Sequence, residues 1–134
     1  MTGAAMLSAA ALVLSQDPVP VVVVEPLVYF GFDSTEPTAD SSPGLEAIDR
    51  FAPSTLCFRI RASADTAGPA AYNLDLSRRR AQVIAGRLMA AGVDADRISL
   101  NPTGETRLAR PTADGVAEPL NRLVWVDIWP CGQT

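Results

Sequence analysis

Residues 60–81 read IRASADTAGPAAYNLDLSRRRA. The first positions have the pattern of a strand end, so Asp65 is expected just beyond a strand. The later positions have helical periodicity, and at 100° per residue they place Arg80 near the middle of an otherwise apolar arc. The other members of that arc are Leu76, Val83, Ile84, Leu88 and Ala91. Arg78 and Arg79 fall on the opposite side of the predicted helix, which is therefore expected to face solvent.

The position of Arg80 raises the question of what satisfies its guanidinium group. An arginine directed toward a core keeps its charge, so it needs acceptors from the fold, from a ligand, or from both. Asp65 is the obvious protein candidate, fifteen residues earlier in the chain. The two residues are therefore interpreted either as the two charges of a ligand clamp or as a structural salt bridge.

The same residues resemble the OmpA-like family of periplasmic peptidoglycan-binding domains, which includes the Pal lipoproteins and flagellar stator proteins. The family pattern is Gly-His-Thr-Asp, a Gly three residues on, and then Asn-x-x-Leu-Ser-x-x-Arg-Ala. The matching residues are Asp65, Gly68, Asn73, Leu76, Ser77, Arg80 and Ala81, followed by Gly92, Arg97, Gly104-Glu105 and Asn121-Arg122. The resemblance spans about Leu27 to Ile128. This sequence departs from the pattern at Ala62-Ser63-Ala64, Pro102 and Leu123.

The remainder of the chain alternates predicted strands and helices. Strand faces are predicted for Val28, Phe30 and Phe32, for Leu56, Phe58 and Ile60, from Ile98 to Leu100, and for Val124, Val126 and Ile128. A short helix is predicted around 44–52, and the second helix is expected to end at Gly92, which suits a left-handed C-cap. The order β-α-β-α-β-β predicts an α+β fold, a two-layer α/β sandwich with both helices on one face of a mixed sheet. The resemblance implies a four-stranded sheet in the order 1-4-2-3, with the last strand antiparallel to the others.

Composition excludes several classes of function. The chain has 134 residues and 48% hydrophobic content, which is enough for one domain with a single core. A net charge of −4 argues against nucleic acid as a partner. The absence of histidine removes the usual general base and most zinc sites, and Glu105 has no partner carboxylate in a recognisable motif. We therefore expect no enzyme activity, no metal site and no cofactor, and interpret Glu105 as a structural acceptor.

The N-terminal residues differ from the rest. Residues 3–14 are small and apolar, and a plausible cleavage junction follows at 15–18. Residues 1–15 are therefore expected to be a signal peptide, although no basic residue precedes Arg50. The run is shorter than the roughly 20 residues that cross a bilayer, so no transmembrane span is expected in the mature chain. Residues 16–26 are expected to be an extended Pro/Val-rich lead-in, and residues 27–134 the OmpA-like domain.

The two cysteines have the same parity on their predicted strands. Cys57 is near the start of the second strand, and Cys131 lies just past the end of the last one. If these strands are antiparallel neighbours, as the resemblance implies, the two positions meet. An exported protein permits oxidation, so a Cys57–Cys131 disulfide is favoured over two free thiols.

The resemblance also implies a ligand. Meso-diaminopimelate of the peptidoglycan stem peptide carries an ammonium and a carboxylate at its side-chain end, so its receptor needs a fixed anion and a fixed cation. Asp65 would bind the ammonium, and Arg80 would bind the carboxylate as a bidentate fork. Asn73 and Leu76 would line the pocket, and Arg122 would add a further contact.

The expected function is non-covalent binding of peptidoglycan in the periplasm, linking the protein to the cell wall. The expected location is the periplasm, in association with the outer membrane or the cell wall. The alternative is a degenerate OmpA-like module that has lost the ligand and acts in protein interaction or envelope assembly through its sheet face. Trp125 and Trp129 have outward parity on the last strand. They either bind a partner, such as another envelope protein, or cover the open side of the sheet.

Overall fold

The computed structural model describes residues 25–132. The predicted signal peptide and most of the predicted lead-in lie outside these residues. The strands are β1 (Leu27–Tyr29), β2 (Leu56–Ser63), β3 (Ile98–Gly104) and β4 (Leu123–Pro130), and the α-helices are α2 (Ser42–Phe51) and α3 (Ala70–Ala90). Short 3-10 turns occupy Ala39–Ser41, Ala95–Arg97 and Pro119–Asn121. No helix in the described part of the chain has the length and hydropathy needed to cross a membrane.

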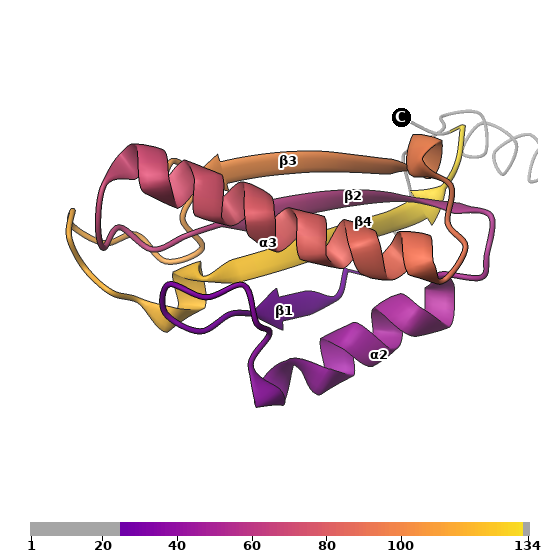
Figure 1. Ribbon diagram of the computed structural model, residues 1–134, viewed down its shortest axis with the longest axis horizontal. Coiled ribbons are helices and arrows are strands. Elements are labelled where there is room, and N and C mark those ends of the chain that lie inside the picture. The colour runs from indigo at the N-terminus through magenta and orange to yellow at the C-terminus, as the bar shows by residue number, and fades with distance from the viewer. Residues whose placement is uncertain (1–24, 133–134) are drawn as a thin grey trace, which may run out of the picture.

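The strands form one mixed sheet in the order β1-β4-β2-β3 (Figure 1). β4 pairs antiparallel with both β1 and β2, whereas β2 and β3 are parallel. This arrangement confirms the α+β sandwich and the strand order 1-4-2-3. The last strand in the described residues, β4, therefore pairs with the first, β1.

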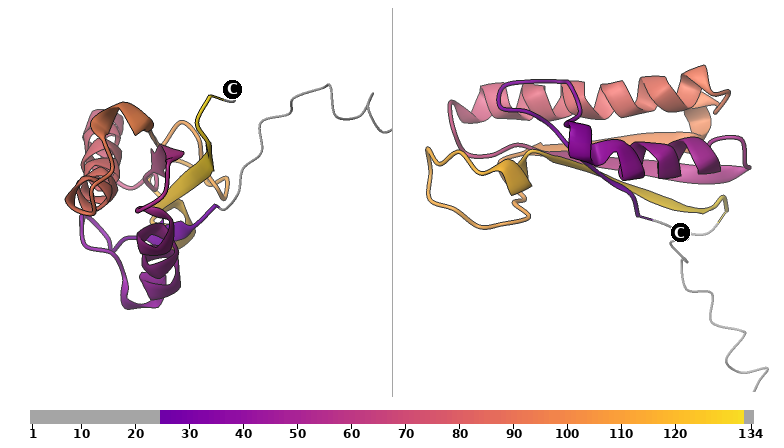
Figure 2. Two further views of the ribbon diagram at one scale, coloured as in Figure 1. Left: turned by 90° about the vertical axis from the view of Figure 1, so that its right-hand side faces the viewer. Right: turned by 90° about the horizontal axis from the view of Figure 1, so that it is seen from below.

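Both helices cover the same face of the sheet (Figures 1 and 2). α3 packs over β2 and β3, and α2 packs beside β1. The inward side chains of β2 and β4 are fully buried, as their alternation predicts: Phe58, Ile60, Val124, Val126 and Ile128. Together with Ile84 and Leu88 of α3 they form the core between sheet and helices. Among residues 25–132, no α-helix covers the opposite face of the sheet (Figure 2).

The predicted first strand is too long. β1 ends at Tyr29, Phe30 makes one isolated bridge to Pro37, and the Phe32 side chain is exposed. The chain turns after Phe32 because Asp33 has a positive φ of 47°. Phe32 therefore belongs to a loop beside the first turns of α3, and its predicted place on one strand face with Val28 and Phe30 is wrong.

The buried face of α3 is displaced from the predicted arc. Leu76, Ile84 and Leu88 are buried as expected, but Val83 and Ala91 are exposed. Small residues, among them Ala81 and Ala85, occupy the buried side instead. Their size lets the helix lie close to the sheet. Arg80 nevertheless remains on the buried face with no exposed surface.

Two boundaries follow from backbone chemistry. Gly92 has φ 99° and accommodates the left-handed turn that ends α3, as predicted. β3 continues to Gly104, past the predicted Ile98–Leu100 start, and includes Pro102. Proline lacks an N–H group, but β3 is an edge strand, where one side of the backbone needs no partner.

Gly44 holds α2 against β1, and its replacement by alanine is expected to destabilise the fold. A Cβ at this position would lie 2.0 Å from the backbone carbonyl oxygen of Leu27. Because that oxygen belongs to a strand, it has little freedom to move, and we expect a loss of at least about 1–3 kcal/mol in the free energy of unfolding. Urea denaturation measures the loss. Gly86→Ala is the matched control, since a Cβ there meets no atom within 4 Å, and equal stability of the two variants would contradict the contact.

The disulfide is present. Cys57 and Cys131 are joined with a Cα–Cα distance of 5.0 Å, and they are separated by 74 residues in sequence. Cys57 lies opposite Trp129 in the β2–β4 register, so the bridge runs diagonally between neighbouring strands. It closes the end of the sheet opposite to the end at which Asp65 follows β2.

Candidate functional site

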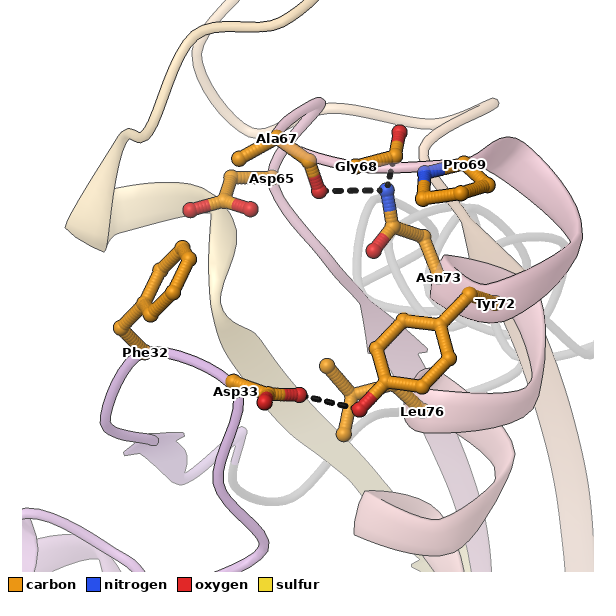
Figure 3. A pocket seen from close by; sticks show the side chains of 9 residues that line it. All are labelled: Phe32, Asp33, Asp65, Ala67, Gly68, Pro69, Tyr72, Asn73 and Leu76. Atoms are coloured by element: carbon orange, nitrogen blue, oxygen red, sulfur yellow. Dashed lines mark hydrogen bonds between the residues drawn. The ribbon is translucent and has the colours of Figure 1, made fainter.

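A small cavity of about 180 Å³ lies between the segment that follows β2, the first turns of α3 and the loop after β1 (Figure 3). Its lining residues are Phe32, Asp33, Asp65, Ala67, Gly68, Pro69, Tyr72, Asn73 and Leu76. Three of the five predicted ligand-binding residues therefore line one cavity: Asp65, Asn73 and Leu76. Arg80 and Arg122 lie outside this lining.

Asp65 has one carboxylate oxygen engaged and one without a donor. Oδ2 accepts hydrogen bonds from Nη1 of Arg122 at 2.9 Å and from the backbone N–H of Glu118 at 3.2 Å. Within residues 25–132, no group donates to Oδ1. The carboxylate is directed into the cavity, between Phe32 and Asn73 (Figure 3). A nearly buried anion with a free acceptor can bind a ligand cation.

Arg80 is bound by backbone carbonyls. Its Nε donates to the carbonyl of Ser34 at 2.9 Å, and Nη2 donates to that of Gly31 at 3.0 Å. Nη1 makes a longer contact, 3.5 Å, with the carbonyl of Ser63 at the end of β2. The guanidinium also lies over the ring of Phe30, 5.4 Å from its centre. Arg80 therefore ties the loop after β1 to the end of β2.

The ion pair at this site joins Asp65 to Arg122, and none of the ion pairs in the described part joins Asp65 to Arg80. Burial lowers the pKa of Arg80 to about 10, and the negative charge of Asp65 opposes that shift. Arg80 is consequently charged at neutral pH. Arg122 also donates through Nε to the carbonyl of Phe30, and it lines a neighbouring cavity of about 210 Å³.

Asn73 shapes the cavity wall. Its amide donates to the carbonyl of Ala67 at 3.0 Å, to that of Gly68 at 3.4 Å, and to Oε1 of Glu105 at 3.3 Å. These bonds hold the segment between Asp65 and α3 in place. Glu105 acts here as an acceptor, which agrees with its interpretation as a structural residue.

Six of the nine lining residues were not predicted as site residues, and three of these six, Phe32, Asp33 and Tyr72, bring a charged or aromatic side chain to the cavity. The hydroxyl group of Tyr72 donates to the carboxylate of Asp33 across the cavity, and Phe32 lies on the other side of Asp33 (Figure 3). In the sequence, Asp33-Ser34 is typical of a turn and carries no further signal, and Tyr72 lies outside the family pattern. Their meeting depends on the conformation of the loop after β1, which the alternation of Val28, Phe30 and Phe32 does not encode.

Three of the positions at which the sequence departs from the family pattern, Ala62, Ser63 and Ala64, lie outside the lining of the cavity. All three are fully buried at the end of β2. The Ser63 hydroxyl donates to the backbone carbonyl of Asn121 at 2.8 Å. These small residues fill space next to the chain that leads into β4.

Comparison with known proteins identifies the family. The model of the OmpA family matches residues 29–122, which include Asp65, Asn73, Leu76, Arg80 and Arg122. The chain belongs to the OmpA family. The peptidoglycan-associated lipoprotein of Haemophilus influenzae is 32% identical over 97 residues, which cover 71% of this chain and 63% of the relative. The chain thus matches less than two thirds of that relative's length.

Solved structures show the same OmpA-family fold. The peptidoglycan-associated lipoprotein of Burkholderia pseudomallei superposes with a TM-score of 0.67 at 23% identity, covering 77% of this chain and 89% of the other. The cell wall anchor of the T6SS from Pseudomonas aeruginosa gives a TM-score of 0.62 at 21% identity, and the match covers 90% of this chain and 93% of the anchor chain. At these identities the likeness establishes the fold alone.

Proposed function

We propose that this OmpA-family chain binds peptidoglycan non-covalently in the periplasm and recognises diaminopimelate of the stem peptide. The observation that carries the proposal is the carboxylate of Asp65, which presents an unengaged oxygen to a small cavity while Arg122 and a backbone N–H hold the other oxygen. The relationship to a peptidoglycan-associated lipoprotein supports the same ligand.

In the proposed complex the ligand ammonium binds Oδ1 of Asp65, and the aliphatic chain contacts Leu76. Asn73 lines the cavity and keeps the segment before α3 in position. The ligand carboxylate binds Arg80, whose Nη1 has the longest and weakest of the three carbonyl contacts. Because Arg80 is buried beneath the loop that includes Gly31 and Ser34, binding includes a local movement of that loop. Arg122 orients Asp65.

Asp65→Asn is expected to weaken retention on diaminopimelate-type sacculi by about 30-fold or more. The change keeps the shape of the side chain and removes the charge that binds the ammonium, and losing one partner of such a pair costs about 2–5 kcal/mol. The measurement is a pull-down of the purified protein with sacculi over a concentration series. Asp96→Asn is the matched control, because Asp96 is exposed in the 3-10 turn before β3, far along the chain from the cavity.

Two further measurements accompany the pull-down: one separates loss of binding from loss of folding, and the other tests the carboxylate half of the site. Asp65→Asn also leaves Arg122 without its charged partner, so the substitution can lower stability as well as binding. Melting curves of both variants therefore define the temperature range in which each is folded. Sacculi with lysine in place of diaminopimelate test the carboxylate half of the site, because lysine has the ammonium alone. A folded Asp65→Asn protein that binds as well as the wild type would refute the proposal. A wild type that does not bind sacculi would favour the module without a ligand.

A further inference from the structure

The face of the sheet that carries no helix has an arginine-rich surface. Arg59 and Arg61 project from β2 on this side, where Arg59 lies opposite Asp127 of β4 and Arg61 lies opposite Trp125. Trp129 is the next residue of β4 on the same face. The guanidinium of Arg61 lies 4.7 Å from the ring centre of Trp125, and that of Arg59 lies 5.6 Å from the ring centre of Trp129. The rings therefore hold two cations in a fixed arrangement.

Asp127 lies beneath these arginines, although its parity predicts a solvent-facing side chain. It is 1% exposed, with Arg59 bound to Oδ2 and Arg61 bound to Oδ1 at 2.8 Å. Burial alone would raise its pKa, but hydrogen bonds with Glu25 and Arg59 and the charge of Arg61 hold the pKa below the usual value. Asp127 is thus an anion shared by two cations.

Several donors on this surface have no partner in the described part of the chain. The buried Nε of Arg61 makes no hydrogen bond, whereas Nη2 is shared between Glu25 and Asp127 at 2.8 Å each. Arg107, in the loop after β3, has no hydrogen bond or ion pair within residues 25–132. With Arg59, this gives three arginines against the two carboxylates of Asp127 and Glu25.

The three arginines meet at one cavity. Its volume is about 210 Å³, and its lining residues are Arg59, Arg61, Asn101, Thr103, Arg107 and Trp125. Among the residues that the structure describes, none in this lining is acidic, although Arg59 and Arg61 pair with Asp127 and Glu25 nearby and the whole chain has a net charge of −4. Guanidinium groups gathered beside the amide of Asn101 form a site for a carboxylate or another oxyanion, whereas the hydroxyl of Thr103 already donates to the carbonyl of Ala62 at 3.0 Å.

A second cavity continues from the first and is mainly apolar. It has a volume of about 370 Å³ and shares Arg61, Arg107 and Trp125 with the arginine cavity. The rest of its lining is Glu25, Leu27, Leu108, Ala109 and Leu123. The shared residues make the two cavities one groove, with cationic groups at one end and aliphatic side chains at the other.

We propose that this groove is a second binding site, and that it takes an acidic segment of a partner protein. The partner's carboxylate side chain binds in the arginine cavity, and a neighbouring aliphatic side chain enters the apolar cavity. Charge complementarity favours this occupant, because a peptide supplies both groups a few ångströms apart. The groove and the cavity of Asp65 lie on opposite faces of the sheet, so one molecule can bind both partners together.

The test uses the full chain and the peptide acetyl-Glu-Leu-Glu-Leu-Glu-Leu-amide, with a Gln-for-Glu peptide as the neutral probe. Tryptophan fluorescence follows binding, because Trp125 lines both cavities. We expect saturable binding of the acidic peptide and at least tenfold weaker binding of the neutral one. Arg107→Gln is expected to weaken binding of the acidic peptide at least tenfold. Arg107 makes no contact that the fold needs, so this variant remains folded.

Arg78→Gln is the matched control, since it removes the same charge from the exposed side of α3. Retention of wild-type affinity in Arg78→Gln would support the groove. Equal losses in the two variants would show attraction by overall charge and overturn the proposal. Equal binding of the acidic and neutral peptides, or no binding of either, would also overturn it. The proposal would also be overturned if the protein bound phosphatidylglycerol vesicles, lost that binding in Arg107→Gln, and did not bind the peptide.

Discussion

Arg80→Met is expected to lower the free energy of unfolding by about 3–5 kcal/mol. Methionine fills much of the same volume, but it cannot donate to the carbonyls of Gly31, Ser34 and Ser63. A buried acceptor without a donor costs about 1–3 kcal/mol, and the longest of the three contacts contributes least. The loss of the buried charge recovers part of this cost, because no desolvation penalty remains. Urea denaturation followed by circular dichroism measures the change.

Arg79→Met is the control for Arg80→Met. Arg79 precedes Arg80 in α3, but its guanidinium is on the exposed side and pairs with Asp75. Exposed pairs of this kind contribute about 0–1 kcal/mol, so this variant is expected to retain nearly all of its stability. If Arg80→Met lowered the free energy of unfolding no more than Arg79→Met, the three carbonyl contacts would not stabilise the fold. The role of Arg80 would then be ligand binding alone.

The buried position of Arg80 could be predicted from the sequence, but its partners could not. Helical periodicity places Arg80 beside Leu76 and Ile84, so burial follows from spacing. Its acceptors are main-chain carbonyls of a loop, and a carbonyl acceptor has no residue type that identifies it. Asp65 was the visible candidate because its side chain is charged. The structure assigns Asp65 to Arg122, 57 residues later in the chain.

The strands show a similar division. Alternation predicted the inward faces of β2 and β4 correctly, because every second residue of a strand shares one face. The same alternation continues through Phe32, but β1 ends at Tyr29, three residues earlier, and the chain turns at Asp33. Parity also placed Asp127 on the outer face without showing that it is buried. Its burial depends on arginines of another strand, so no local pattern could reveal it. The strand order came from the family resemblance.

Of the residues at the cavity, those close together in sequence could be predicted, and those brought together by tertiary packing could not. Asp65, Asn73 and Leu76 meet at one cavity because the segment after β2 leads directly into α3, and short spacing fixes their arrangement. Asp33 and Tyr72 reach this cavity from segments 39 residues apart. Contacts of that kind depend on tertiary packing, and only the family pattern or the structure can supply them.

Removing the disulfide is expected to lower the free energy of unfolding by roughly 4 kcal/mol. The bridge joins residues 74 positions apart, and in the chain-entropy model a closed loop of this length restricts the unfolded chain by about that amount. The comparison is between the oxidised protein and the same protein in reducing agent, by urea denaturation. The Cys57→Ser, Cys131→Ser double variant is the control, because reducing agent should leave its stability unchanged.

Ligand binding by the reduced protein is expected to equal that of the oxidised protein wherever both are folded. Cys57 lies eight residues before Asp65 on an extended strand, which places the bridge about 26 Å from the cavity at 3.3 Å per residue. The bridge therefore constrains the unfolded chain without shaping the site. Unchanged stability on reduction, or two alkylatable thiols in native protein prepared from the periplasm, would contradict the bridge as a stabilising element. A loss of binding by folded, reduced protein would show that strain passes along β2 from one end of the sheet to the other.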